Sequence, residues 1–140
     1  QRQTILYDNP EHKFTHLTVV IDEVLALSEG TNKNIKDSFF SLLSQIALLG
    51  RATKVHLLLV SQRFDYNSIP VSVREQLNVL IQIGNINSKT VQFLFPDLDP
   101  DGIVIPVGVG TGLIMVIDNE HPYAVLPLLC PTYYTKKGIL

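Results

Sequence analysis

The sequence of 140 residues contains a single cysteine, Cys130, and no tryptophan. One cysteine excludes an internal disulfide framework and is typical of proteins from a reducing compartment. No apolar run reaches the roughly 18 residues of a membrane-spanning helix, and no secretory signal is present. The formal net charge of −2 gives no global attraction to nucleic acid or anionic lipid, so any such contact has to be local.

The composition is that of a folded domain, with 46% hydrophobic and 17% charged residues. A chain of this length suits one domain that buries roughly two thirds of its unfolded surface. We expect a polar leading segment at 1–17, a core at 18–129 and a tail at 130–140. There is no internal repeat and no low-complexity segment.

Predicted strands and helices alternate along the chain. The helix expected from Asn34 to Leu49 carries an apolar stripe at helical spacing, and Gly50 is predicted to end it. The continuous apolar run 55–60 predicts a strand that is covered on both faces. The other expected elements are strands at 18–21 and 79–83, a short helix after Pro70, a helix from Ser88 to Pro96, and a hairpin of strands 113–117 and 123–129 that turns at 118–122.

This order of elements predicts an α/β fold with a mostly parallel sheet and a carboxyl-terminal antiparallel hairpin. The series Gly108-x-Gly110-x-Gly112 leads into a strand, whereas a dinucleotide-binding fingerprint needs a helix there, so a Rossmann-type enzyme is disfavoured. His16 is interpreted as an ordinary surface histidine and His56 as a satisfied core or sheet-end histidine, rather than as metal ligands.

The run from Thr18 to Ile21 ends in two adjacent carboxylates, Asp22 and Glu23. Charges this close to a core are costly unless they are solvated, paired or bound to metal. One interpretation is a parallel strand that opens into a site, where Asp22 holds a hydrated Mg²⁺ and Glu23 polarises a water. The alternative is a plain exit from a strand into a loop, since acidic residues favour turns and the first turns of helices.

Polar residues also follow the next buried strand, where Ser61 and Gln62 come directly after residues 55–60. Ligands of α/β sheets bind beyond the carboxyl ends of the strands. Because Asp22 and Glu23 occupy the same kind of position, the four residues together favour a functional site over two unrelated loops.

Taken together, these segments resemble the second half of the motor domain of the FtsK/SpoIIIE family of hexameric DNA translocases, over residues 18–129. The resemblance lies in residues 19–23, 50–52 and 56–63, in Asn78 before the next strand, and in the glycine-rich entry to the final hairpin. It implies a RecA-like P-loop NTPase fold, ATP with Mg²⁺ as cofactors, and a hexameric ring that is threaded by double-stranded DNA.

Carried over to matching positions, the resemblance implies that Asp22 is the Walker B residue, which binds Mg²⁺ through water, and that Glu23 is the general base for the attacking water. Gln62 would sense the γ-phosphate, and Ser61 beside it would contact the nucleotide. Arg51 matches the finger that reaches the ATP of a neighbouring subunit. Its alternative role is a helix-end cation on a solvated face.

Two further arginines, Arg63 and Arg74, flank residues 64–73, a loop that the resemblance brings to the pore for contact with DNA phosphates. Such contact needs only a few local cations and is compatible with a net charge of −2. The alternative for both arginines is an ordinary solvated surface.

The sequence departs from the family pattern at several positions. Phe64 stands where the family often has proline, Lys54 where glycine is common, and Val-Leu-Ala-Leu at 24–27 where Phe-Ala-Asp-Leu is usual. These departures point toward a divergent branch, such as the motors of conjugative elements.

A larger departure is that no G-x-x-x-x-G-K-[ST] motif occurs, so the backbone nest and the lysine that cradle phosphates are missing. The chain also begins at Gln1 instead of Met. We therefore expect the carboxyl-terminal portion of a longer protein, inactive by itself, with the Walker A strand and any membrane anchor upstream and this domain in the cytoplasm.

The sequence leaves three hypotheses for the function of the longer protein. The first is ATP-driven translocation of double-stranded DNA, in chromosome segregation or conjugative transfer. The second is an ATPase that moves protein, as in type VII secretion. The third is a degenerate ATPase-like module that only binds partners.

Overall fold

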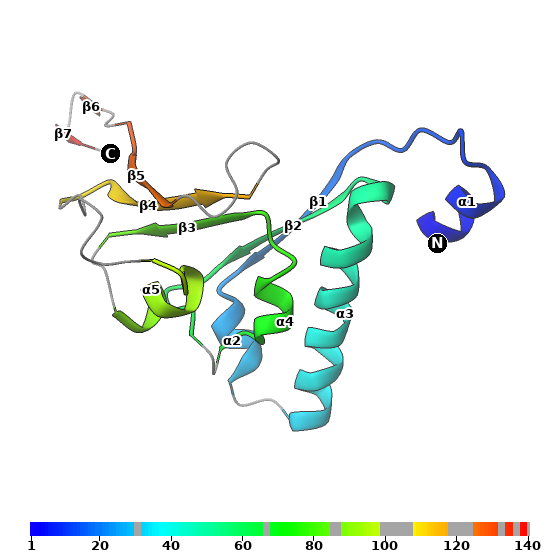
Figure 1. Ribbon diagram of the computed structural model, residues 1–140, viewed down its shortest axis with the longest axis horizontal. Coiled ribbons are helices and arrows are strands. Elements are labelled where there is room, and N and C mark those ends of the chain that lie inside the picture. The colour runs from blue at the N-terminus through cyan, green and yellow to red at the C-terminus, as the bar shows by residue number, and fades with distance from the viewer. Residues whose placement is uncertain are drawn as a thin grey trace. The chain divides into compact units, whose positions relative to one another are not determined.

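The computed structural model describes residues 1–29, 32–65, 68–84, 88–98, 108–117, 125–131, 134–135 and 138–139 (Figure 1). Residue contacts divide the chain into unit 1 (Gln1–Leu77) and unit 2 (Asn78–Leu140). Every candidate site residue predicted from the sequence belongs to unit 1. None of the helices in the described part of the chain is both long enough and apolar enough to cross a membrane.

Two parallel strands and the helix that connects them form the centre of unit 1 (Figure 1). Strand β1 (Leu17–Asp22) is followed by helix α3 (Lys33–Thr53) and then by strand β2 (Val55–Val60). Parallel neighbours need such a crossover because the chain has to return to the end of the sheet at which it started. Leu17 pairs with Val55 and Asp22 with Val60, so both strands finish at the same edge of the sheet.

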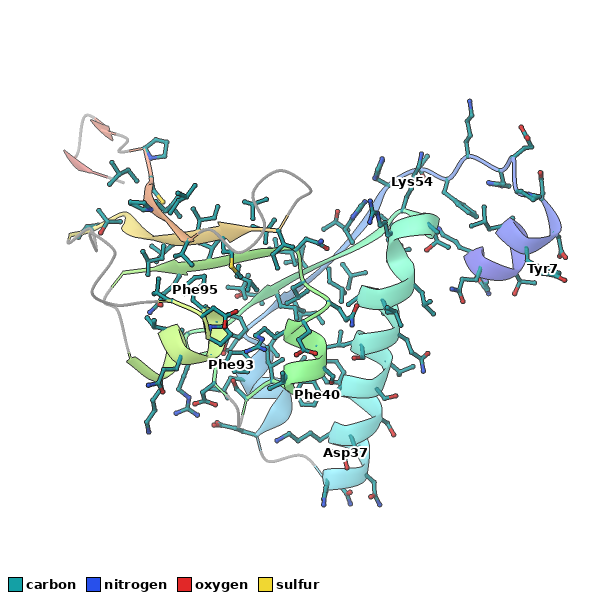
Figure 2. The ribbon with its side chains drawn as sticks, in the orientation of Figure 1. Tyr7, Asp37, Phe40, Lys54, Phe93 and Phe95 are labelled. Atoms are coloured by element: carbon teal, nitrogen blue, oxygen red, sulfur yellow. The ribbon has the colours of Figure 1, made fainter. Side chains whose placement is uncertain are left out.

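Alternating burial along β2 shows that only one face of this strand is well covered. Leu57 and Leu59 are partly buried on the covered side, and α3 contributes the buried Phe40 and Leu43 to the core of the unit (Figure 2). On the other face, Leu58 keeps 51% of its surface exposed. This corrects the sequence prediction that the strand is covered on both faces.

Gly50 does not end the long helix, contrary to the sequence prediction. Helix α3 continues for a further turn to Thr53. A Cβ atom at Gly50 would overlap the carbonyl oxygen of Val55, the first residue of β2. The glycine is therefore needed for the close approach of the helix to the strand. In the sequence alone, a glycine required by such packing looks the same as a glycine that ends a helix.

The helix ends instead at Lys54, whose backbone is left-handed with φ 55° and ψ 39°. This conformation reverses the chain from α3 into β2, and the Lys54 carbonyl oxygen accepts a hydrogen bond of 2.9 Å from the backbone N–H of Leu17 at the start of β1. Glycine adopts left-handed geometry without steric cost. The preference for glycine that the family resemblance implies at this position thus has a physical reason.

Unit 1 also contains two helices that the sequence did not predict and one short helix that it did. Helix α1 (Arg2–Asp8) lies in the leading segment, and α2 (Val24–Ser28) follows β1 directly. Helix α4 (Val71–Arg74) begins after Pro70, as predicted. Arg2 of α1 donates hydrogen bonds to the carbonyl oxygens of Thr15 (2.8 Å) and Thr53 (2.9 Å), which ties the leading segment to the end of α3.

Two histidines meet near the amino ends of the strands. His16 Nδ1 and His56 Nε2 are 2.8 Å apart, so one nitrogen donates a hydrogen bond to the other. Among the residues that the structure describes, no group of three or more His, Cys, Asp or Glu side chains is arranged to hold a metal ion.

Unit 2 is built on an antiparallel sheet of three strands in the order β3 (Val79–Ile83), β4 (Thr111–Val116), β5 (Val125–Leu129). The predicted hairpin corresponds to β4 and β5, and its turn at 118–122 lies outside the described residues. Phe93 and Phe95 supply large buried side chains to this unit (Figure 2). The elements are β3 (Val79–Ile83), α5 (Ser88–Leu94), β4 (Thr111–Val116), β5 (Val125–Leu129), and the short pair β6 (Tyr134–Thr135) and β7 (Gly138–Ile139).

The pairing of β3 corrects the prediction of a mostly parallel sheet. Strand β3 pairs antiparallel with β4, with Gln82 opposite Leu113, and the described strands contain one parallel pair, β1 with β2. Gly112 explains part of this pairing, because a Cβ atom there would overlap the carbonyl oxygen of Gln82. An apolar run such as 79–83 predicts a strand but does not indicate whether the neighbouring strand is parallel or antiparallel.

We predict that Gly50→Ala lowers the free energy of unfolding of the chain by about 1–3 kcal/mol, because the methyl group collides with the Val55 carbonyl. In an exposed helix the same substitution would stabilise by about 1 kcal/mol. Urea denaturation followed by circular dichroism measures the change. Ser41→Ala, at an exposed position of the same helix, is the control and should shift stability by no more than about 0.5 kcal/mol. A stabilised Gly50→Ala variant would contradict the close packing.

We also predict that Lys54→Gly raises the free energy of unfolding by about 0.5–1 kcal/mol, because it removes the steric cost of the left-handed backbone. Lys54→Ala keeps a Cβ atom and should give no gain, which separates the backbone effect from the loss of the lysine charge. The same denaturation experiment compares both variants. Equal behaviour of the glycine and alanine variants would refute the explanation.

Candidate functional site

The carboxyl edge of the parallel pair brings together the four residues predicted from the ends of the two strands. Asp22 is the last residue of β1 and pairs with Val60, the last residue of β2. Glu23 follows Asp22 directly, and Ser61 and Gln62 follow Val60. Their shared location results from the aligned register of the strands.

A hydrogen bond joins the two strand ends at this edge. Ser61 Oγ donates to Glu23 Oε1 over 2.9 Å, and both residues are half-buried. Asp22 and Gln62, in contrast, are exposed. The edge therefore consists of one oriented carboxylate with an exposed carboxylate and an exposed amide beside it.

The backbone of Glu23 is left-handed, with φ 62° and ψ 65°. For a residue with a Cβ atom this conformation costs about 1–2 kcal/mol, and such residues occur preferentially at functional sites. The next residue, Val24, is fully buried and begins helix α2. Burial of Val24 and the bond from Ser61 hold Glu23 in place at the sharp turn from strand to helix.

The donor set at this edge fits a hydrated magnesium ion. Mg²⁺ prefers carboxylate oxygens and water, and the adjacent carboxylates of Asp22 and Glu23 supply the first of these. The phosphate groups of a nucleotide also need positive charge or a nest of backbone N–H groups. The sequence has no phosphate-binding motif of the Walker A type.

Arg63 is held by two carboxylates next to the site. Its Nε lies 3.0 Å from Asp65 Oδ2, its Nη2 lies 3.6 Å from Glu29 Oε1, and half of its side chain is exposed. Its backbone N–H also donates to Ser61 Oγ over 3.4 Å. A DNA phosphate would have to compete with these carboxylates for the guanidinium group, and the predicted DNA contact of Arg63 stays a prediction.

The loop after Arg63 is anchored by a buried pair of side chains. The backbone N–H of Asp65 donates to Ser68 Oγ (2.8 Å), and the backbone N–H of Ser68 donates to Asp65 Oδ1 (2.9 Å). Arg74, at the far end of the predicted pore loop, has a side chain only 13% exposed and lies 3.8 Å from the Glu75 carboxylate. This burial leaves little of the Arg74 side chain for a DNA backbone.

Arg51 lies at the other end of the sheet from the carboxylates. It occupies the last turn of α3, which leads into the amino end of β2, and it is exposed. Strand β2 is six residues long, so its two ends are roughly 17 Å apart. Arg51 therefore does not reach Glu23 of its own chain. Its exposed position at the helix end agrees with a solvated helix-end cation and with a finger that acts on another copy, and the finger stays a prediction.

Sequence reasoning missed the partners that surround the site. Asp65 and Ser68 have the Asp-x-x-Ser spacing of reciprocal bonds between side chain and backbone, a signal that could have identified them. No local sequence pattern identifies Glu29, since Glu29 and Arg63, which are in contact, are 34 residues apart in the sequence. The donor role of Ser61 toward Glu23 is likewise invisible in either strand alone.

Comparison with known proteins identified the fold. Neither a protein-family model nor a curated protein matches the sequence. The solved structures that match the fold include the cytoplasmic domain of the type VII secretion ATPase EccC from Thermomonospora curvata, and the conjugation coupling protein TcpA of pCW3 in a monomer form with ATPγS.

The EccC structure has a TM-score of 0.62 at 23% identity, and the TcpA structure has 0.64 at 19%. Each match covers 91% of this chain, which spans 14% of the EccC chain and 36% of the TcpA chain. The chain thus has an α/β fold that also occurs in a secretion ATPase and in a conjugation coupling protein.

We predict that Ser68→Ala lowers the free energy of unfolding by about 1–3 kcal/mol, because it removes the buried hydroxyl that accepts a hydrogen bond from the backbone N–H of Asp65. Ser72→Ala, at an exposed position of α4, is the matched control and should change stability by less than about 0.5 kcal/mol. Thermal denaturation of the chain measures both. If the two variants behave alike, the Asp65–Ser68 pair does not anchor the loop.

Proposed function

We propose that the chain is part of an ATP-driven double-stranded DNA translocase of the FtsK/SpoIIIE type, which acts in chromosome segregation or conjugative DNA transfer. The observation that carries the proposal is the carboxyl edge of β1 and β2, where Glu23 is bonded to Ser61 and adjoins Asp22. The fold shared with the coupling protein TcpA supports it.

In this proposal each residue of the edge has a separate task. Asp22 binds Mg²⁺ through a water molecule, and its exposure leaves room for the hydrated ion. Glu23 accepts a proton from the water that attacks the γ-phosphate. Gln62 donates its amide hydrogen to a γ-phosphate oxygen. Magnesium supplies the positive charge that the γ-phosphoryl group needs during transfer.

The rest of the proposed site comes from outside this chain. In the proposal, a preceding segment of a longer protein supplies the Walker A strand and completes a RecA-like sheet. Another preceding segment anchors the protein to a membrane, and this domain lies in the cytoplasm. Arg51 serves a neighbouring copy in a hexameric ring, consistent with its distance from Glu23. An arginine delivered in this way is worth about 10³–10⁵ in rate.

A second candidate function is an ATPase that moves protein, as in type VII secretion. The fold match to EccC favours it, and so do the two arginines that were expected to contact DNA. Arg63 is opposed by two carboxylates, and Arg74 is largely buried. A module that only binds partners is less well supported, because it would not need an oriented glutamate beside an aspartate.

The test uses the full-length product of the gene that encodes this chain. We predict ATP hydrolysis that duplex DNA stimulates and that Glu23→Gln lowers by about 10²–10⁴, since it removes the general base. Glu11→Gln, at an exposed glutamate of the leading segment, is the matched control and should keep full activity. Activity is measured as phosphate release at several salt concentrations, because DNA-dependent stimulation should weaken as salt increases.

The other outcomes separate the alternatives. Hydrolysis that ignores DNA but responds to a secreted protein would replace the first candidate with the second. A folded full-length protein without ATPase activity would leave the partner-binding module as the remaining hypothesis.

A further inference from the structure

The hydroxyl group of Ser61 makes contacts that its predicted role does not explain. The family resemblance implies a contact between Ser61 and the nucleotide. In the structure, Ser61 Oγ donates a hydrogen bond of 2.9 Å to Glu23 Oε1. The same oxygen accepts a hydrogen bond of 3.4 Å from the backbone N–H of Arg63. A serine hydroxyl carries one hydrogen, and here that hydrogen is directed to the glutamate. While this bond exists, Ser61 cannot donate to a phosphate.

The glutamate that receives this bond is the side chain whose orientation matters most at the edge. A general base has to lie within hydrogen-bond reach of the proton that it accepts. A glutamate side chain has three rotatable bonds, so it needs a partner to keep one orientation. The left-handed backbone of Glu23 fixes only the start of the side chain. The bond from Ser61 fixes its end.

We propose that Ser61 is a positioning residue, which holds Glu23 by Oε1 so that the second carboxylate oxygen receives the proton of the attacking water. This inference rests on the proposed function. The backbone N–H of Arg63 in turn orients the Ser61 hydroxyl, since it donates to the same oxygen. Removal of the hydroxyl should therefore impair the chemical step and leave nucleotide binding unchanged.

The first test follows the orientation of Glu23 in the chain itself, without nucleotide. NMR spectra of Ser61→Ala, Ser61→Thr and Ser41→Ala are compared with the wild-type spectrum. We expect Ser61→Ala to shift the side-chain carboxylate resonance and the backbone amide resonance of Glu23, because the donor is lost. Ser61→Thr keeps the hydroxyl and should preserve both resonances, as should Ser41→Ala on the exposed side of α3. Identical Glu23 resonances in the alanine and threonine variants of Ser61 would overturn the inference.

The second test uses the full-length protein and separates kcat from KM. We expect Ser61→Ala to lower kcat about ten- to a hundred-fold, the range for loss of a hydrogen bond to a charged group, with KM for ATP unchanged. Ser61→Thr should retain most of the activity. A raised KM at unchanged kcat would mean that Ser61 contacts the nucleotide instead. If Ser61→Ala has wild-type kinetics while Glu23→Gln is inactive, the positioning role of Ser61 is refuted and the proposed function is not.

The two tests also distinguish failure of this inference from failure of the proposed function. If the full-length protein hydrolyses no ATP, the proposed function is wrong. The NMR comparison then still decides whether Ser61 orients Glu23.

Discussion

The register of β1 against β2 is the constraint on which the candidate site depends. Because Asp22 lies opposite Val60, the residues that follow the two strands emerge side by side, and Ser61 comes within bonding distance of Glu23. A slip of one residue would turn every side chain of a strand to the opposite face and separate this pair. The register is set at the other end of the strands. There Gly50 lets α3 approach Val55, and the carbonyl oxygen of Lys54 accepts a hydrogen bond from the backbone N–H of Leu17.

Charge is distributed unequally around this edge. Asp22 and Glu23 lie at this edge, and the nearby Arg63 is paired with the carboxylates of Glu29 and Asp65. An acidic edge attracts a divalent cation but repels the phosphates of a nucleotide unless positive charge arrives from elsewhere. The acidic edge agrees with the proposed function, in which the positive charge or backbone nest for the phosphates comes from other polypeptide.

The sequence predicted those parts of the fold that depend on local pattern. The strands of the parallel pair, the strand at 79–83 and the final hairpin follow from apolar runs and from their separation. Gly50 was misread because its role depends on the carbonyl of Val55, a contact between elements that a helix pattern does not contain. The direction of β3 was missed for the same reason, since its apolar run suits either kind of neighbour. The convergence of residues at the carboxyl edge was predictable from topology, but the bond from Ser61 to Glu23 was not, because it requires coordinates of both strand ends.

The separation of Arg51 from Glu23 bears on how such a domain would work. Helix α3 carries the arginine to the amino end of β2, while the glutamate lies at the carboxyl end, roughly 17 Å away along the strand. Within one chain the two groups cannot act on the same phosphate. If both are used, as the proposed function states, the glutamate of one copy and the arginine of another have to meet at the nucleotide. Hydrolysis would then depend on the contact between neighbouring copies, and the crossover from β1 through α3 to β2 would connect one nucleotide site with the next.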